Sequence, residues 1–287
     1  MTLPGPHAMG SPVLQLCDGF IMLSKLASDF RGIIRVSGFG TALRWAACVA
    51  VTMPQNLRNR NLLAADKLMG TGPFRVRHSA GNAVLTGIQA FSGLREIWVR
   101  DVYARGDFLQ IPDGGLVVDL GANMGNFSTL ALAANPTARL VGVEPSREMA
   151  GKWRATVKAN GFEDRATLCE AFVGVFTSKQ QSDFDNDPNY RGVALLSEAE
   201  FLGRYGIERI AFLKCDIEGS EFFMIEPGSR ILDMTDRLAI EVHDFGGDVN
   251  LFLKGLRERG FTDVAVDWYG AECIARAARP SALPRAV

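Results

Sequence analysis

The sequence has few of the features that mark a metal-binding, disulfide-bonded or membrane-spanning protein. Its five cysteines occur singly, with no CxxC pair, which argues against a zinc centre or a disulfide framework and favours a reducing cytoplasm. The N-terminus lacks a basic start followed by an apolar core, and the most apolar early stretch is interrupted by Arg35 and Arg44. We therefore expect no signal peptide and no membrane span.

The chain also lacks an excess of either charge. Lys and Arg number 31 against 32 Asp and Glu, a formal net charge of -1, so no strong field gathers nucleic acid or an anionic membrane. Neither is expected as a partner. With 287 residues, of which 47% are hydrophobic, the chain can bury a sizeable core and reads as globular.

Three regions differ in their sequence pattern. We expect residues 1–72 to form a helical cap or accessory segment. Four of its aromatic residues are expected to lie in its core or, alternatively, in a homo-oligomer interface: Phe20, Phe30, Phe39 and Trp45. Residues 73–107 form a small antiparallel unit, with strands over 74–77, 83–88 and 96–103 and a turn at 81–82. Residues 108–287 alternate strands and helices as in an α/β domain.

The third region predicts a seven-stranded, mostly parallel sheet that ends in an antiparallel hairpin, because only a turn separates its last two strands. The predicted strands are 116–120, 139–144, 166–171, 210–215, 237–242, 262–267 and 272–277. The predicted helices are 126–134, 147–160, 198–205, 220–232 and 249–259.

A glycine turn follows the first of these strands, in Asp119-Leu-Gly-Ala-Asn-Met-Gly125. In an open parallel sheet such a turn lets the backbone approach a cofactor closely. The dinucleotide fingerprint GxGxxG is not met, because Asn123 and Asn126 replace its second and third glycines. Asp119 itself either bonds the turn amides or contacts the cofactor.

Glu144 ends the second strand, about 20 residues or slightly more beyond the glycine turn, where a carboxylate can accept both ribose hydroxyls. The alternative is that Glu144 is a solvent-exposed acid before a helix N-terminus, where the helix dipole stabilises a negative charge without any cofactor. The glycine turn before it favours the cofactor role.

A run of charge marks the strand end at Leu213-Lys-Cys-Asp-Ile-Glu-Gly-Ser-Glu221. Such crowding costs stability unless partners or ligands compensate it, so it indicates a site. Asp216 carries most of the functional expectation. Lys214 either assists an acceptor oxygen or compensates charge, Glu218 binds the cofactor or shapes the turn, and Glu221 fits a helix start.

These segments, followed by Ile240-Glu-Val-His243, resemble in content and order the FkbM family of methyltransferases over residues 107–268. The resemblance implies a Rossmann-like class I methyltransferase fold, S-adenosylmethionine as the donor, and transfer to a hydroxyl of a secondary metabolite or sugar. By position, Asp119, Gly121, Asn123 and Gly125 line the methionine end of the donor, Glu144 its ribose, and Ala171 its adenine.

Methyl transfer to an alcohol requires that the oxygen, the methyl carbon and the sulfur are aligned. It also requires a base that accepts the hydroxyl proton or a metal that lowers the pKa of the hydroxyl. His243, at a predicted strand end, is the expected general base, or else a histidine satisfied by a neighbouring carboxylate. Asp216, Glu241 and His243 are a candidate Mg²⁺ site. A nicotinamide-dependent oxidoreductase and a non-catalytic cofactor-binding scaffold are the alternative functions.

Overall fold

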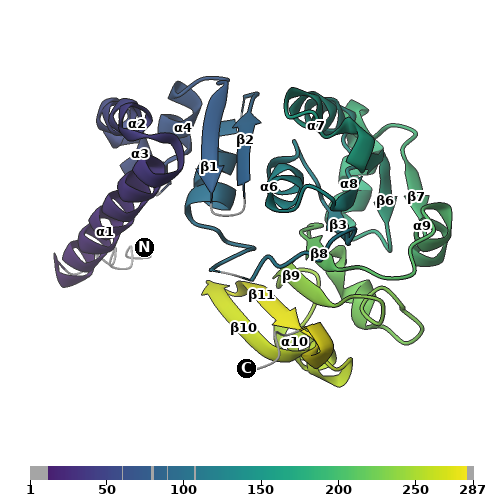
Figure 1. Cartoon of the computed structure of the whole chain (residues 1–287). Coiled ribbons are helices and arrows are strands. Elements are labelled where there is room, and N and C mark those ends of the chain that lie inside the picture. The colour runs from purple at the N-terminus through teal and green to yellow at the C-terminus, as the bar shows by residue number, and fades with distance from the viewer. Residues whose placement is uncertain (1–11, 60, 79–80, 89, 107, 283–287) are drawn as a thin grey trace, which may run out of the picture.

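A seven-stranded sheet forms the centre of the protein. The computed structural model describes residues 12–59, 61–78, 81–88, 90–106 and 108–282, and its sheet has the order β10-β11-β9-β8-β3-β4-β5 (Figure 1). Five strands are parallel, and β10 and β11 pair antiparallel at one edge, which confirms the predicted sheet. The strands are β3 (Leu116–Leu120), β4 (Arg139–Val143), β5 (Ala166–Cys169), β8 (Phe212–Cys215), β9 (Arg237–Val242), β10 (Thr262–Tyr269) and β11 (Glu272–Ala278).

Alternating side chains of the central strands feed two hydrophobic cores, one on each face. Val117 and Phe212 pack on one face with α6 (Asn126–Ala134) and α7 (Arg147–Ala159). Val118 and Leu213 pack on the other with α9 (Glu198–Arg204) and α10 (Val249–Glu258). The period of two places successive residues on opposite faces, so both layers of helices follow from the strand sequences.

The N-terminal helices extend the core of the α6 face. They are α1 (Pro12–Ser37), α2 (Phe39–Val51), α3 (Met53–Asn59) and α4 (Leu63–Leu68), and they pack beside the hairpin of β1 (Phe74–His78) and β2 (Gly81–Leu85). Trp45 is buried in this core and Phe30 packs against it, whereas Phe39 is 61% exposed. The side chain of Phe20 lies outside the described residues.

The antiparallel unit differs from its prediction. Gly81 and Asn82 belong to β2 rather than to a turn, and residues 96–103 form no strand. Instead, α5 (Ala90–Gly93) continues into the π-helix η1 (Leu94–Val99). The buried residues Ala90, Leu94 and Trp98 recur every four positions, so the helical period prevails over the apparent alternation.

Two further predictions in the α/β region need correction. The helix expected over 220–232 is only the 3-10 helix η4 (Ser220–Ile225), because Pro227 disfavours helical conformation at the residue before it and Gly228 has φ +94°. The strand expected to reach residue 171 ends at Cys169. Ala171 starts β6 (Ala171–Val173), which pairs in parallel with β7 (Ala194–Leu196) in a separate sheet.

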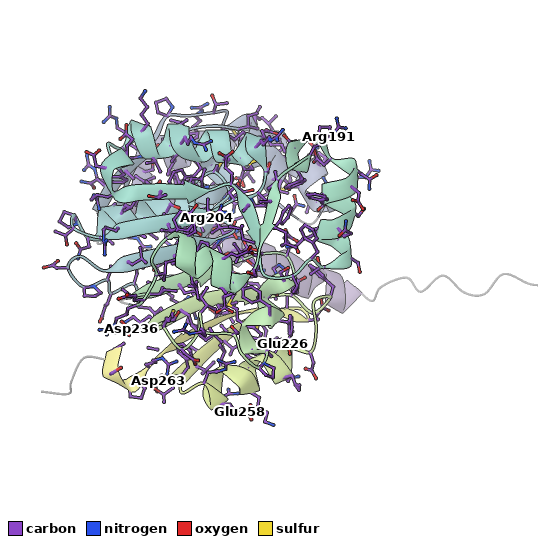
Figure 2. The ribbon with its side chains drawn as sticks, turned by 90° about the vertical axis from the view of Figure 1, so that its right-hand side faces the viewer. Arg191, Arg204, Glu226, Asp236, Glu258 and Asp263 are labelled. Carbon is purple, nitrogen blue, oxygen red and sulfur yellow. The ribbon has the colours of Figure 1, made fainter. Side chains whose placement is uncertain are left out.

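The remaining short elements lie between these strands and at the end of the chain. Figure 2 shows the side of the molecule that carries α9, with Arg204 at the end of this helix and Asp236 in the connection leading into β9. The short elements are α8 (Ser178–Asn186), η2 (Glu163–Arg165), η3 (Pro188–Tyr190) and η5 (Pro280–Ala282).

No helix within the described residues is long and apolar enough to cross a bilayer. Cys48, Cys169, Cys215 and Cys273 are buried free thiols. The expected reducing compartment stays a prediction.

Candidate active site

The glycine turn after β3 brings three strand ends together. Gly121 has φ +74°, and a Cβ atom there would lie 1.8 Å from the carbonyl oxygen of Asp216, so only glycine fits. The amides of Gly121 and Ala122 donate to the carbonyl of Val143 at 3.0 and 2.9 Å. The turn after β3 is therefore in contact with the ends of both β4 and β8.

Glu144 holds the same turn from the end of β4. Its Oε2 accepts the amide of Asn123 and its Oε1 accepts the amide of Ser146, both at 2.8 Å. Burial raises its pKa to about 7, although the two backbone hydrogen bonds act in the opposite direction. A carboxylate has about four acceptor positions, so this group can shape the turn and still accept ribose hydroxyls.

Lys214 is buried beneath the glycine turn. Its Nζ donates to the carbonyl of Gly121 at 2.7 Å and lies 3.4 Å from Oδ1 of Asp119 and 3.8 Å from Oδ2 of Asp216. Burial lowers its pKa, but these carboxylates outweigh burial and the net shift is upward. Lys214 is thus a fixed cation that stabilises the turn.

Asp119 lies directly behind the turn and is completely buried. Its Oδ2 accepts the hydroxyl of Ser128 at 2.6 Å, and that hydroxyl accepts the indole N–H of Trp153 at 2.9 Å. Its Oδ1 has no hydrogen bond in the described structure and faces Lys214 at 3.4 Å. Asp119 therefore anchors the turn from inside.

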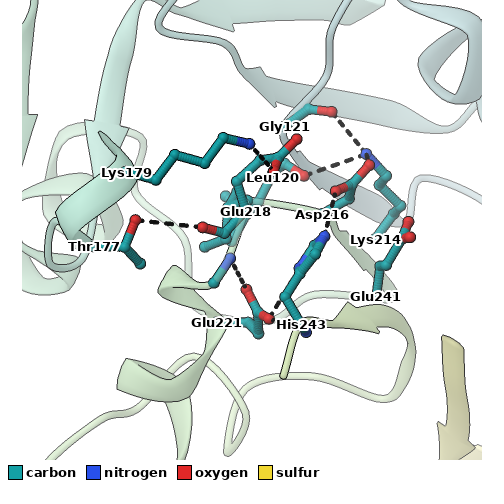
Figure 3. A network of polar contacts seen from close by, with 12 residues as sticks. Leu120, Gly121, Thr177, Lys179, Lys214, Asp216, Glu218, Glu221, Glu241 and His243 are labelled. Atoms are coloured by element: carbon teal, nitrogen blue, oxygen red, sulfur yellow. Dashed lines mark hydrogen bonds and ion pairs between the residues drawn. The ribbon is translucent and has the colours of Figure 1, made fainter. Parts of the chain in front are cut away.

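Asp216 emerges at the end of β8 and faces a cavity of about 120 Å³. The glycine turn and the segment of η1 both line this cavity. The Asp216 side chain is 31% exposed, and its carboxylate lies between Lys214 and His243 (Figure 3). The hydroxyl of Tyr103 is 3.3 Å from its Oδ2. The lining residues are Ser92, Gly93, Glu96, Ile97, Tyr103, Gly121, Ala122, Asn123, Met124, Asn126, Phe127, Lys214 and Asp216.

His243 lies behind Asp216 and is held by Glu221 (Figure 3). Its Nδ1 is 3.1 Å from Oε1 of Glu221, its amide donates to the same oxygen at 2.6 Å, and its Nε2 is 3.9 Å from Oδ1 of Asp216. Burial lowers the pKa of His243, but the hydrogen bond and charge of Glu221 outweigh it and raise the pKa to about 9. The imidazole is therefore charged at neutral pH and poorly suited to accept a proton.

Glu221 is more than a helix start. It is completely buried, and its Oε2 also accepts the amide of Gly219 at 2.9 Å. One carboxylate thus fixes both the turn before η4 and the ring of His243.

The expected Mg²⁺ ligands Asp216, Glu241 and His243 do not form a coordination site. Throughout the described part of the chain, no group of three or more His, Cys, Asp or Glu side chains is arranged to hold a metal ion. One physical reason is that Oε2 of Glu241 is already engaged, because it accepts the hydroxyl of Tyr103 at 3.0 Å. Burial, followed by repulsion from Asp216, raises the pKa of Glu241 to about 7.

Five residues expected to contact the cofactor are not among those that line the cavity: Asp119, Gly125, Glu144, Ala171 and Glu218. Glu218 has φ +55° and a half-exposed side chain that pairs with Lys179. Ala171 is buried in β6, directly before Phe172 in the sequence. Phe172 lies 5.5 Å from Tyr190, whose pKa is raised to about 12 by burial and then by Glu144. Their cofactor roles stay predictions.

Sequence reasoning missed the wall formed by η1 and the residues after it. Glu96 opens onto the cavity, where desolvation and then Asp216 raise its pKa. Tyr103 is 3% exposed and reaches both Asp216 and Glu241. The available signal was the four-residue spacing of the apolar residues Ala90, Leu94 and Trp98, which is typical of a helix and would have placed one where a strand was predicted.

Comparison with known proteins identifies the family. The Methyltransferase FkbM domain matches residues 119–262, half of the chain. The AMB antimetabolite synthetase AmbE of Pseudomonas aeruginosa is 30% identical over 151 residues, which cover 52% of this chain and 7% of that protein's length.

Solved structures are similar at lower identity. The precorrin-6y C5,15-methyltransferase of Geobacter metallireducens has 15% identity and a TM-score of 0.41, over 60% of this chain and 85% of that one. An O-methyltransferase family protein of Burkholderia thailandensis has 12% identity and a TM-score of 0.41, over 66% and 58%. From the domain match, the chain belongs to the FkbM family of methyltransferases.

Proposed function

We propose that this protein transfers a methyl group from S-adenosylmethionine to a hydroxyl oxygen of a small molecule bound in the cavity beside Asp216. The observation that carries the proposal is the position of the Asp216 carboxylate. It faces a cavity that the glycine turn at Gly121 also lines, and this turn is the part of the family motif expected to hold the donor.

The residues of the turn fit this donor. Gly121 keeps the backbone free of side chains at the strand end, and Glu144 retains acceptor positions beyond its two backbone bonds. When bound, S-adenosylmethionine supplies a methyl group activated on a sulfonium.

In the proposed reaction, Asp216 accepts the proton of the acceptor hydroxyl as the O–CH₃ bond forms and the methyl–sulfur bond breaks. General-base assistance of this kind contributes roughly 10²- to 10⁴-fold. Lys214 holds the turn and the charged His243 supports the carboxylate, which replaces the expected assignment of His243 as the base. Neither residue is required to gain or lose a proton.

The family resemblance and the relative support a choice of acceptor class. AmbE is named as an antimetabolite synthetase, and we place hydroxylated secondary metabolites and sugars first among candidate acceptors. Nucleic acid is not proposed as a substrate, because the chain carries a net charge of only -1.

Calorimetry and mass spectrometry test the proposal. The protein should bind S-adenosylmethionine and its demethylated product but not NAD, and a screen of candidate acceptors should reveal one that gains a methyl group. Asp216→Asn should retain donor binding and lose at least roughly 100-fold in transfer rate. The matched control is Asp263→Asn, on the exposed start of β10. NAD binding in place of the sulfonium donor would reject the proposal.

A further inference from the structure

Tyr103 connects two carboxylates that come from neighbouring strands of the sheet. Its hydroxyl is 3.0 Å from Oε2 of Glu241, in β9, and 3.3 Å from Oδ2 of Asp216, directly after β8. The residue lies outside the segment that matches the family domain, which begins at residue 119. Tyr103 is therefore not part of the segment that the family domain matches.

The ring of Tyr103 is fixed from both sides. It packs edge-on against Phe127, at the start of α6, with centroids 5.8 Å apart, and Nζ of Lys214 lies 5.3 Å from its centroid. Burial leaves only 3% of the residue exposed. The phenol consequently has little freedom to move away from the two carboxylates.

The backbone that carries Tyr103 is anchored to the hairpin of β10 and β11. The buried guanidinium of Arg276 donates to the carbonyl of Val102 at 2.9 Å and to Asp267 at 2.7 Å. Arg105 donates to the same aspartate at 2.8 Å. The hydroxyl is thus held in place by contacts on both sides of Tyr103 in the sequence.

We infer that Tyr103 is a positioning residue, whose hydroxyl bridges Glu241 and Asp216 and thereby turns the Asp216 carboxylate toward the acceptor cavity. This rests on the proposed function, in which Asp216 is the base. A phenol has one proton, and both carboxylates lie within hydrogen-bond distance of it, so the hydroxyl can donate to Asp216 as well as to Glu241.

The protonation state of the Tyr103 phenol suits this role. Burial, followed by the charges of Asp216 and Glu241, raises the pKa of Tyr103 well above its usual value. The hydroxyl therefore keeps its proton throughout the working pH range and acts as a permanent bridge. Among the groups facing it, Lys214 is a cation and Glu96 is a third carboxylate.

Tyr103→Phe tests the inference because it removes the bridge and retains the ring packing. In a crystal structure of this variant with S-adenosylhomocysteine, the Asp216 carboxylate should be rotated or distributed over several orientations. Calorimetry should show unchanged affinity for S-adenosylhomocysteine. With the acceptor identified by screening, kcat should fall roughly 10- to 100-fold while the KM for the donor is unchanged.

The matched control is Tyr205→Phe, which removes a phenol at the end of α9 and should change none of these quantities. Unchanged positions of the Asp216 and Glu241 carboxylates in the Tyr103→Phe crystal structure would overturn the inference. Failure of the wild type to bind S-adenosylhomocysteine would instead reject the proposed function, so the two failures are distinguishable.

Discussion

At the scale of single residues, the carboxylate of Glu144 holds the glycine turn and is proposed to bind the ribose of the donor as well. Its two oxygens each accept a backbone amide, from Asn123 and Ser146, and they keep further acceptor positions for a ribose. The same carboxylate can therefore bind the ribose and accept the two backbone amides. Removal of the carboxylate shows whether donor binding or stability depends on it more strongly.

We predict that Glu144→Ala weakens the binding of S-adenosylmethionine by at least roughly tenfold, because hydrogen bonds to a charged group are worth about 1.5–3 kcal/mol each. The same change should lower the free energy of unfolding, since the amide of Asn123 loses its acceptor. Calorimetric titration and urea unfolding measure the two effects. Glu148→Ala, on the exposed surface of α7, is the control, and equal donor affinity in wild type and Glu144→Ala would remove the ribose assignment.

At the scale of elements, the sequence predicted the secondary structure correctly wherever the apolar residues of a segment followed a single clear period. The strands from Leu116, Arg139 and Phe212 are buried and apolar, and their glycine turns and charged ends were found in the right places. The strand predicted over residues 96–103 was wrong, because the sequence of this segment also fits an alternating pattern. The structure has a π-helix over Leu94–Val99, in which Leu94 and Trp98 are buried.

The same limit applies to the candidate site. Asp119, Asp216 and His243 belong to motifs, so their proximity followed from the parallel sheet. The roles of Glu221 and Tyr103 depend on contacts across the chain, 22 and 138 residues apart, and no local pattern specifies such contacts. The proposal of Asp216 rather than His243 as the base has the same origin, because it rests on the contact between His243 and Glu221.

Arg95 attaches the π-helix to the N-terminal helices, which gives a prediction for this element. Its guanidinium pairs with Asp66 at 2.6 Å and Asp29 at 2.5 Å, and its side chain is only 7% exposed. Arg95→Met should lower the free energy of unfolding by about 3–5 kcal/mol, because it leaves buried carboxylates without this partner. Urea unfolding measures the loss. Arg31→Met, on the exposed surface of α1, should change it by less than about 0.5 kcal/mol, and a similar small effect at Arg95 would contradict the anchoring role.

At the scale of the whole molecule, the site draws on more of the chain than the family domain. Residues 119–262 supply the glycine turn and the charged strand ends, whereas Glu96 and Tyr103 complete the cavity from the N-terminal side. The N-terminal helices share a core with α6, through Trp45 and Phe127 among others. The expected boundaries near residues 72 and 107 stay predictions, and one hydrophobic core extends across both of them.

Several buried ionisable groups of the site have raised pKa values, which predicts how stability changes with pH. For Glu144 and Glu241, whose pKa is about 7, a raised pKa means that the folded state binds the proton more tightly than the unfolded state. Their contribution is fully present below about pH 4.5 and is lost as pH rises through about 7. For His243, with a pKa of about 9, the contribution is present below about pH 6.5 and is lost as pH rises through about 9.

All three contributions therefore decrease as the pH rises. We predict that the free energy of unfolding falls by several kcal/mol between pH 5.5 and pH 9. Urea unfolding at intervals of half a pH unit measures this slope. His243→Gln should remove the part of the slope that lies above pH 7, because that part comes from loss of the imidazolium that pairs with Glu221 at 3.1 Å. A stability that is constant from pH 7 to pH 9 in the wild type would show that His243 is not held as a cation, and His243 would then again be a candidate for the general base.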